Sequence, residues 1–239
     1  NLTVVVRALF AGGASRLTSY ALPLSIFLLA LFLRLLPGER MVDDAYITFR
    51  YARNLVTGLG LVYNAGERVL GTTTPLYTLL MAGLAFVLRS QNFPAIALWV
   101  NALADGFTCA LLIPLGESLS GSKWVGTAAG ALYAVAPFSV TFAIGGMETS
   151  VFVLLLVLTA FLYLRPDSTP IRPHTHTPLW PLTAALALLT RPDALIFIGP
   201  LAAAAALRIA FSAQPLKQKA REAAQAALIF AAPVMPWLV

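Results

Sequence analysis

Two adjacent aspartates, Asp43 and Asp44, open the part of the chain that is best suited to chemistry. Tyr46, Arg50 and Arg53 follow Asp43 at intervals of three, seven and ten residues, so these side chains share one face of a helix. A carboxylate can take a proton from an attacking hydroxyl group, and an arginine can hold two oxygens of one phosphate. The segment therefore predicts a site for an anionic ligand.

The other face of the same predicted helix is apolar. Ala45, Phe49, Ala52 and Val56 follow one another at helical spacing. An amphipathic helix of this kind lies along a lipid surface, with its acidic and basic groups turned away from the lipid. The expected ligand is therefore both lipidic and anionic.

The composition is that of a membrane protein. The chain has 239 residues, of which 59% are hydrophobic and only 11% are charged, whereas soluble domains average roughly 25% charged residues. We expect an all-α integral membrane protein, multi-pass in the plasma membrane. The net charge of +6 is spread along the chain, so no nucleic-acid partner is expected. A single cysteine, Cys109, excludes an internal disulfide framework.

About seven transmembrane helices are predicted, with amphipathic juxtamembrane helices in the first external loop. The chain reads as a single module over 1–239: a first span at 20–36, an external loop at 37–92 and the remaining spans at 93–239. Several segments are shorter than the roughly 20 residues that a straight crossing needs, and 179–190 is the weakest. The candidate spans are 20–36, 93–119, 124–144, 150–164, 179–190, 194–211 and 224–239.

The apolar segment 75–88 decides the topology. Its 14 residues are typical of an interfacial helix that does not cross the bilayer. If the N-terminus is cytoplasmic, non-crossing places most basic residues inside, as the positive-inside rule requires. These are Arg7, Arg16, Lys123, Arg165, Arg172, Lys217, Lys219 and Arg221.

The same choice gathers three acidic turns on the outer side: Asp43-Asp44, 145–149 and Arg191-Pro192-Asp193. Several arginines are then outside as well, and phosphate binding would explain them: Arg40, Arg50, Arg53, Arg68 and Arg89. The proline-rich stretch 166–181 reads as a linker between spans, and its His174 and His176 have a metal-like spacing without acidic or cysteine partners nearby.

Three stretches carry a family resemblance. They are DDAYITFRYARNLVTGLGLVYNAGERVLGTTTPLYTLL at 43–80, GGMETSVFVLLL at 145–156 and LLTRPDALIF at 188–197. Together they resemble the multi-spanning membrane glycosyltransferases of the GT-C fold, and most of all the arabinofuranosyltransferase-like members that use polyprenyl-phosphate sugars. The resemblance extends over roughly 22–211.

The resemblance implies a catalytic centre in the first external loop, near an acidic pair that Asp43 and Asp44 match. It implies that 75–88 is the second juxtamembrane helix and that Glu148 occupies a second acidic turn. It also implies a polyprenyl-phosphate sugar donor and an envelope glycan, lipid or protein as acceptor. Family members are usually longer and often carry a C-terminal soluble domain, so we expect the C-terminal part of the protein to be missing here.

In this hypothesis Asp43 or Asp44 takes the proton of the attacking hydroxyl group. Arg50, Arg53 and Arg191 stabilise the leaving phosphate, and Tyr46 contacts the substrate. Glu148 orients a sugar hydroxyl or, with Asp43 and Asp44, holds a divalent metal; nothing in the sequence fixes a metal requirement.

Each of these residues also has a structural alternative. An aspartate can cap the helix that follows it, and Arg50 and Arg53 can extend to lipid headgroups. Glu148 can be an acid favoured by a helix N-terminus. Arg191 and Asp193 can form a local ion pair. Asp105 lies inside a predicted span, where a hydrogen bond to a neighbouring helix is its expected role.

Two other functions remain open. The chain could be a non-catalytic, glycosyltransferase-like scaffold subunit within a larger membrane protein complex. A transporter of lipid-linked sugars is less favoured, because transporters usually combine two related halves with polar sites at the bilayer midplane.

Overall fold

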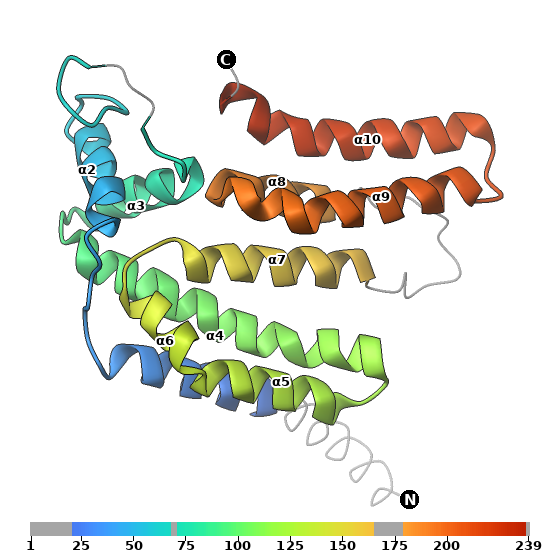
Figure 1. Cartoon of the computed structure of the whole chain (residues 1–239), viewed down its shortest axis with the longest axis horizontal. Coiled ribbons are helices and arrows are strands. Elements are labelled where there is room, and N and C mark those ends of the chain that lie inside the picture. Colours follow the sequence, from blue (N-terminus) through green and yellow to red (C-terminus); the bar gives the residue numbers. More distant parts are fainter. Residues whose placement is uncertain (1–20, 68–70, 165–178, 238–239) are drawn as a thin grey trace, which may run out of the picture.

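The computed structural model describes residues 21–67, 71–164 and 179–237 (Figure 1). Within these ranges every regular element is a helix and none is a strand, which confirms the all-α prediction. Most of the predicted linker, with His174 and His176, lies outside the described residues, and so do Arg7, Arg16, Arg68, Arg165 and Arg172.

The described residues form a series of helices and 3-10 turns. In chain order they are helix Ala21–Leu35, α2 (Ala45–Val56), α3 (Pro75–Leu88), α4 (Phe93–Ser120), α5 (Lys123–Val135), α6 (Pro137–Ile144), α7 (Thr149–Leu164), α8 (Trp180–Thr190), the 3-10 turn η1 (Pro192–Ala194), α9 (Leu195–Phe211), α10 (Leu216–Val234) and the 3-10 turn η2 (Met235–Trp237). The predicted bounds of the 75–88 helix are confirmed.

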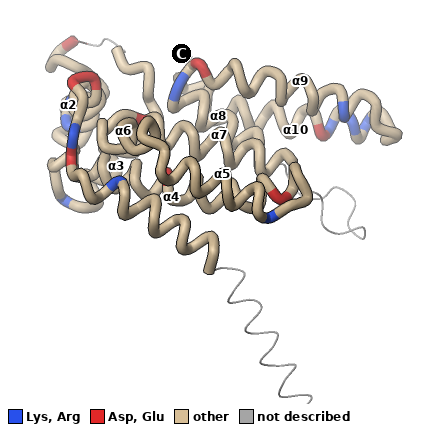
Figure 2. Tube along the Cα trace, turned by 60° about the horizontal axis from the view of Figure 1, so that its bottom comes forward, with Lys and Arg blue, Asp and Glu red and all other residues tan. Residues whose placement is uncertain are grey.

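The long helices run back and forth, and α2 and α3 lie at one end of this bundle (Figure 1). The segment before α2, the α6–α7 turn and the α8–α9 junction are all at that end, so the three acidic turns lie together as the non-crossing interpretation of α3 predicted. The α4–α5 and α9–α10 turns are at the other end. Charged residues gather toward the two ends (Figure 2).

Two of the described helical segments are long and apolar enough to cross a membrane: α4, with 28 residues, and the continuous stretch Pro192–Phe211, with 20 residues. The pair α5 and α6 would be a third span if its 54° bend lies within the bilayer. These helices indicate membrane association.

The prediction of about seven transmembrane helices is not confirmed. Helices occur at all seven places, but α7 and α8 have only 16 and 11 residues, against about 20 for a straight crossing. The last helix, α10, begins at Leu216 and not at 224, because Lys217, Gln218 and Lys219 are strong helix formers and extend it toward the N-terminus.

Glycines bring α4 and α5 into close contact. A Cβ atom on Gly130 would lie 2.5 Å from the carbonyl oxygen of Cys109, and one on Gly126 would overlap the backbone of Ile113. Small residues four positions apart let two helix backbones approach in this way. The Gly126–Gly130 spacing therefore serves a contact within the chain.

A buried ion pair ties the helix Ala21–Leu35 to α4. Nε of Arg34 donates to Oδ2 of Asp105 at 2.9 Å, and neither side chain is exposed to solvent. The hydroxyl group of Tyr133 donates to the other carboxylate oxygen at 3.1 Å. The predicted hydrogen bond from Asp105 to a neighbouring helix is thus confirmed, with Arg34 as a partner that the sequence did not reveal.

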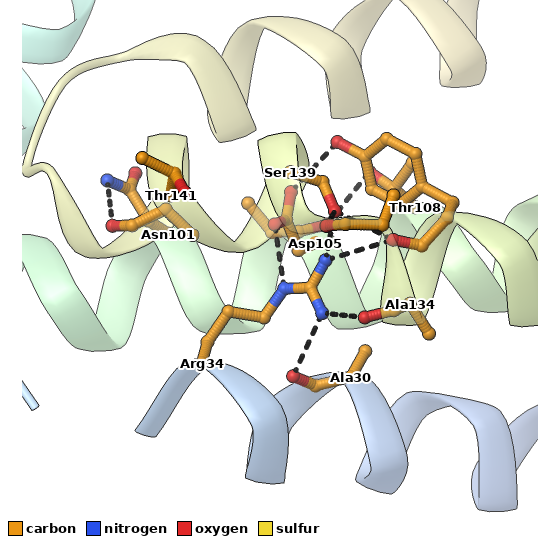
Figure 3. Close-up of polar contacts among 12 residues, drawn as sticks. Ala30, Arg34, Asn101, Asp105, Thr108, Ala134, Ser139 and Thr141 are labelled. Atoms are coloured by element: carbon orange, nitrogen blue, oxygen red, sulfur yellow. Dashed lines mark hydrogen bonds and ion pairs between the residues drawn. The ribbon is translucent and has the colours of Figure 1, made fainter. Parts of the chain in front are cut away.

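The same arginine donates hydrogen bonds to backbone carbonyls at the bend between α5 and α6 (Figure 3). Pro137 has no N–H group, so the carbonyl of Tyr133 loses its helical donor. Nη2 of Arg34 donates to that carbonyl at 3.2 Å and to the Ser139 hydroxyl at 2.8 Å, while Nη1 donates to the carbonyl of Ala134. Buried carbonyls need such donors, so Arg34 stabilises the bend.

Candidate functional site

The α6–α7 turn carries Glu148, and other segments hold its backbone. The amide of Asn101 on α4 donates to the carbonyls of Ala143 and Met147 at 3.1 and 2.9 Å. The hydroxyl group of Tyr77 on α3 donates to the carbonyl of Gly146 at 3.1 Å and to Oδ1 of Asn101 at 3.3 Å. Tyr77 and Asn101 are completely buried.

The segment before Asp43 holds the two remaining carbonyls. The backbone N–H of Arg40 donates to Ile144 at 3.1 Å, and that of Val42 donates to Gly145 at 3.0 Å. Each of the five carbonyls from 143 to 147 therefore accepts a hydrogen bond from a residue outside this segment, which we call the 143–147 turn. Because Val42 directly precedes Asp43, these bonds bring two acidic turns together.

Close contact explains the glycine at position 146. Its φ is +80°, a left-handed conformation that favours glycine. A Cβ atom there would collide with the sulfur of Met41 and would lie 3.3 Å from Ala45 and Phe49. The start of α2 therefore packs directly against the 143–147 turn.

Glu148 joins the third acidic turn through Arg191. Nη1 of Arg191 lies 3.3 Å from Oε1 of Glu148, and its Nε and Nη2 each donate to a carboxylate oxygen of Asp193 at 3.0 Å. The guanidinium group also lies over the ring of Phe152, 5.6 Å from its centroid. The predicted local pair of Arg191 and Asp193 is confirmed, and Glu148 extends it across α7 and α8.

The electrostatics of the cluster follow from its burial. Glu148 is only 5% exposed, and this burial raises the pKa of its carboxyl group, although the nearby Arg191 charge opposes the effect. Hydrogen bonding to Asp193 raises the pKa of Arg191, which therefore stays cationic. Its side chain is 35% exposed, so part of the cation still faces outward.

Asp43 and Asp44 are exposed, and neither side chain has a hydrogen bond or ion pair with any residue that the structure describes. Asp44 stands at the N-cap position of α2, yet its side chain makes no capping bond. The Asp44 side chain therefore does not cap α2. Both carboxylates are available to a ligand.

The basic residues predicted on one face of α2 have different environments in the structure. Arg50 is held by the loop after α2: its Nε donates to the carbonyl of Tyr63 and its Nη2 to Oδ1 of Asn64, each at 2.9 Å. Its guanidinium group also stacks on the Tyr63 ring, 4.3 Å from the centroid. Arg53 and Tyr46 are exposed. Arg50 therefore orders the loop.

Asp43, Asp44 and Glu148 are the predicted ligands if a divalent metal binds. In the part of the chain that the structure describes, no three His, Cys, Asp or Glu side chains lie close enough to hold a metal ion together. These three carboxylates therefore do not form a metal-binding group here.

Sequence reasoning missed Tyr77 and Asn101, the side chains that hold the 143–147 turn. A signal was present, because each is a polar residue within an apolar helix. Buried polar groups need partners, so each pointed to a contact, but the sequence could not name the partner.

A search for similar proteins found no matching family model, no matching curated protein and no matching solved structure. The resemblance to GT-C glycosyltransferases therefore rests on the motifs at 43–80, 145–156 and 188–197.

Proposed function

We propose that this protein is a membrane glycosyltransferase that moves a sugar from a polyprenyl-phosphate donor to an envelope glycan, lipid or protein. One observation carries the proposal: backbone bonds from Arg40 and Val42 join the Asp43-Asp44 turn to the turn that bears Glu148. Exposed carboxylates, a buried acid and a half-exposed arginine thus meet at one end of an apolar helical bundle.

The reaction would be a single displacement. A hydroxyl oxygen of the acceptor attacks the anomeric carbon, and the bond from that carbon to the phosphate oxygen breaks. Asp43 or Asp44 takes the hydroxyl proton, and the polyprenyl phosphate leaves with the bonding electrons. Because that phosphate is a good leaving group, cationic stabilisation is more important than a proton donor.

The cations have different roles in this proposal. Arg191 presents the exposed part of its guanidinium group to the leaving phosphate, while Asp193 and Glu148 fix its orientation. Arg53, which is exposed on α2, adds a second positive charge. Tyr46 lies one turn before Arg50 and offers a hydroxyl group to the sugar.

The proposal includes a topology. The end of the bundle with the acidic turns faces outside the plasma membrane, and the end with Lys123, Lys217, Lys219 and Arg221 faces the cytoplasm. In this arrangement α3 lies along the outer membrane surface, and α2 packs on it through an apolar face that is buried within the protein. The other helices cross, the shorter ones by way of local bilayer thinning.

The direct test is single replacement of the two exposed aspartates. Asp43→Asn and Asp44→Asn would be assayed in membranes that contain the full-length protein, with polyprenyl-phosphate pentoses and hexoses as donors. At least one variant should lose about 100-fold or more in transfer rate if it removes the base. Glu67→Gln is the matched control, because Glu67 is an exposed acid in the same loop. Wild-type rates in both aspartate variants would overturn the assignment.

A scaffold function is the second candidate, and one observation favours it. Of the three arginines predicted to stabilise the leaving phosphate, Arg50 and Arg191 are already bound within the protein. A scaffold would transfer no sugar with any donor and would copurify with a separate transferase, whose activity would survive Asp43→Asn and Asp44→Asn. Transfer by the purified full-length protein alone would exclude this alternative.

A further inference from the structure

Helix α3 is apolar on its exposed face as well as on its buried face. Tyr77 and Thr78 are its only side chains with polar groups, and both are completely buried. Phe86 and Val87, near its C-terminal end, are each 74% exposed. An exposed face of this kind is stable when lipid covers it.

Arg89 follows immediately and ends the helix. Its φ is +51°, which makes it the one non-glycine residue with a positive φ in the described part of the chain. This left-handed conformation is unfavourable for a residue with a Cβ atom. The Arg89 side chain is exposed, and its guanidinium group has no partner among the described residues. This conformation belongs to the C-terminal cap of α3, where the N–H groups of Arg89 and Ser90 donate to the carbonyls of Phe86 and Ala85.

An open cavity of about 530 Å³ lies beside this arginine. Val56 of α2 and Phe86 and Val87 of α3 contribute apolar side chains, and Arg89, Ser90 and Gln91 contribute polar ones. The lining contains one cation and no acid, so its charge suits an anion that is attached to an apolar chain.

We infer that this cleft binds a bilayer phospholipid. The lipid phosphodiester lies on the guanidinium group of Arg89, whose planar fork can hold two phosphate oxygens. The acyl chains lie along Phe86 and Val87. The contact would anchor the juxtamembrane helix and fix its depth in the membrane.

The cleft is separate from the candidate active site. Tyr77, at the start of α3, contacts the 143–147 turn, whereas the cleft is at the other end of the helix. The 14 residues of α3 extend about 20 Å at 1.5 Å per residue. The inference depends on membrane association and not on glycosyl transfer, so it can fail or succeed independently of the proposed function.

The test uses the purified full-length protein in a neutral detergent. Dioleoyl phosphatidylglycerol should raise its thermal unfolding midpoint and should appear as a bound lipid in native mass spectrometry. Dioleoylglycerol, which lacks the phosphate, and inorganic phosphate, which lacks the chains, should do neither.

Arg89→Gly separates lipid binding from folding. Glycine adopts the left-handed conformation without strain, so the variant should be at least as stable as the wild type without lipid. It should nevertheless bind phosphatidylglycerol about tenfold or more weakly, and Arg89→Lys should lose part of the binding because the fork is missing. Arg221→Ala is the control, since Arg221 is an exposed arginine on α10.

Three results would overturn the inference. Arg89→Gly could retain the full lipid-induced rise, or dioleoylglycerol could act as well as phosphatidylglycerol. A polyprenyl monophosphate could also displace the phospholipid at equal concentration, which would assign the cleft to a sugar-donor lipid.

Discussion

Arg34 and Asp105 pair across the interior of the bundle with 2.9 Å between Nε and Oδ2, and neither side chain contacts solvent. The guanidinium group also reaches Ala30, Ala134, Tyr133 and Ser139. One charged side chain thus joins helix Ala21–Leu35, α4 and the bend between α5 and α6.

Removing one partner of this pair should be severely destabilising. Arg34→Met leaves a buried carboxylate, and Asp105→Leu leaves a buried cation, so each should reduce the unfolding free energy by about 3–5 kcal/mol. The double variant should recover part of that loss, although the carbonyl of Ala134 loses its side-chain donor; the Ser139 hydroxyl group still donates to the carbonyl of Tyr133. Thermal unfolding in detergent would measure these changes. Glu117→Gln, an exposed site on α4, is the control, and losses that simply add in the double variant would refute the coupling.

The glycine contact between α4 and α5 should tolerate no side chain. Gly130→Ala places a methyl group against the backbone of Cys109 and should cost about 1–3 kcal/mol of stability, as overpacking does. Gly199→Ala on α9 is the matched control, since a Cβ atom there meets nothing within 4 Å and alanine favours helix. The two unfolding midpoints should therefore shift in opposite directions. A harmless Gly130→Ala would show that the helices are not in contact.

Tyr77→Phe tests the support of the 143–147 turn. The variant loses the hydrogen bonds to Gly146 and Asn101, so it should cost about 1–3 kcal/mol with little change in helix content. If the turn positions Glu148, the transfer rate should fall further than the stability loss explains. Tyr46→Phe changes an exposed hydroxyl group and is the stability control. An unchanged unfolding midpoint for Tyr77→Phe would argue against the support.

Glu148 should make the stability depend on pH. Burial raises its pKa in the folded protein above that of the unfolded chain, which is about 4.3 for glutamate. The folded state therefore binds this proton more tightly, and its stability should fall as the pH rises from about 4.3 through the raised pKa. Above that pKa no further change is expected from this group.

Glu148→Gln should remove this part of the pH dependence, and Arg191 keeps its two bonds to Asp193 in the variant. Unfolding midpoints measured across the acidic range would give the slope for each protein. Glu39→Gln, at an exposed position, is the control substitution. An identical slope in wild type and Glu148→Gln would exclude Glu148 as its source.

The helices were predictable because apolar runs reveal them, and the bounds of α3 agreed to the residue. The number of spans was not predictable in this way. Lys217 and Arg221 interrupt the apolar pattern, yet α10 continues through them because lysine and arginine are good helix formers although they are not apolar.

The acidic residues of the candidate site were predictable from the sequence, but the hydrogen-bond partners of the site residues were not. The spacing from Asp43 to Arg53 revealed the shared helical face. Arg50 nevertheless binds Tyr63 and Asn64, since a loop of irregular conformation gives no sign of where its carbonyls lie. The hydrogen bonds that the backbone N–H groups of Arg40 and Val42 donate were not predictable either, because every residue except proline carries the same N–H group.

In the proposed membrane topology, the burial of the Arg34 guanidinium group against Asp105 has a consequence for how the chain enters the bilayer. Arg34 precedes Asp105 by 71 residues. During synthesis the arginine therefore reaches the membrane-insertion machinery well before its counter-ion. Inserting an unpaired arginine is costly. We therefore expect the helix Ala21–Leu35 to enter the lipid only together with α4, so that the two helices insert as one neutral unit.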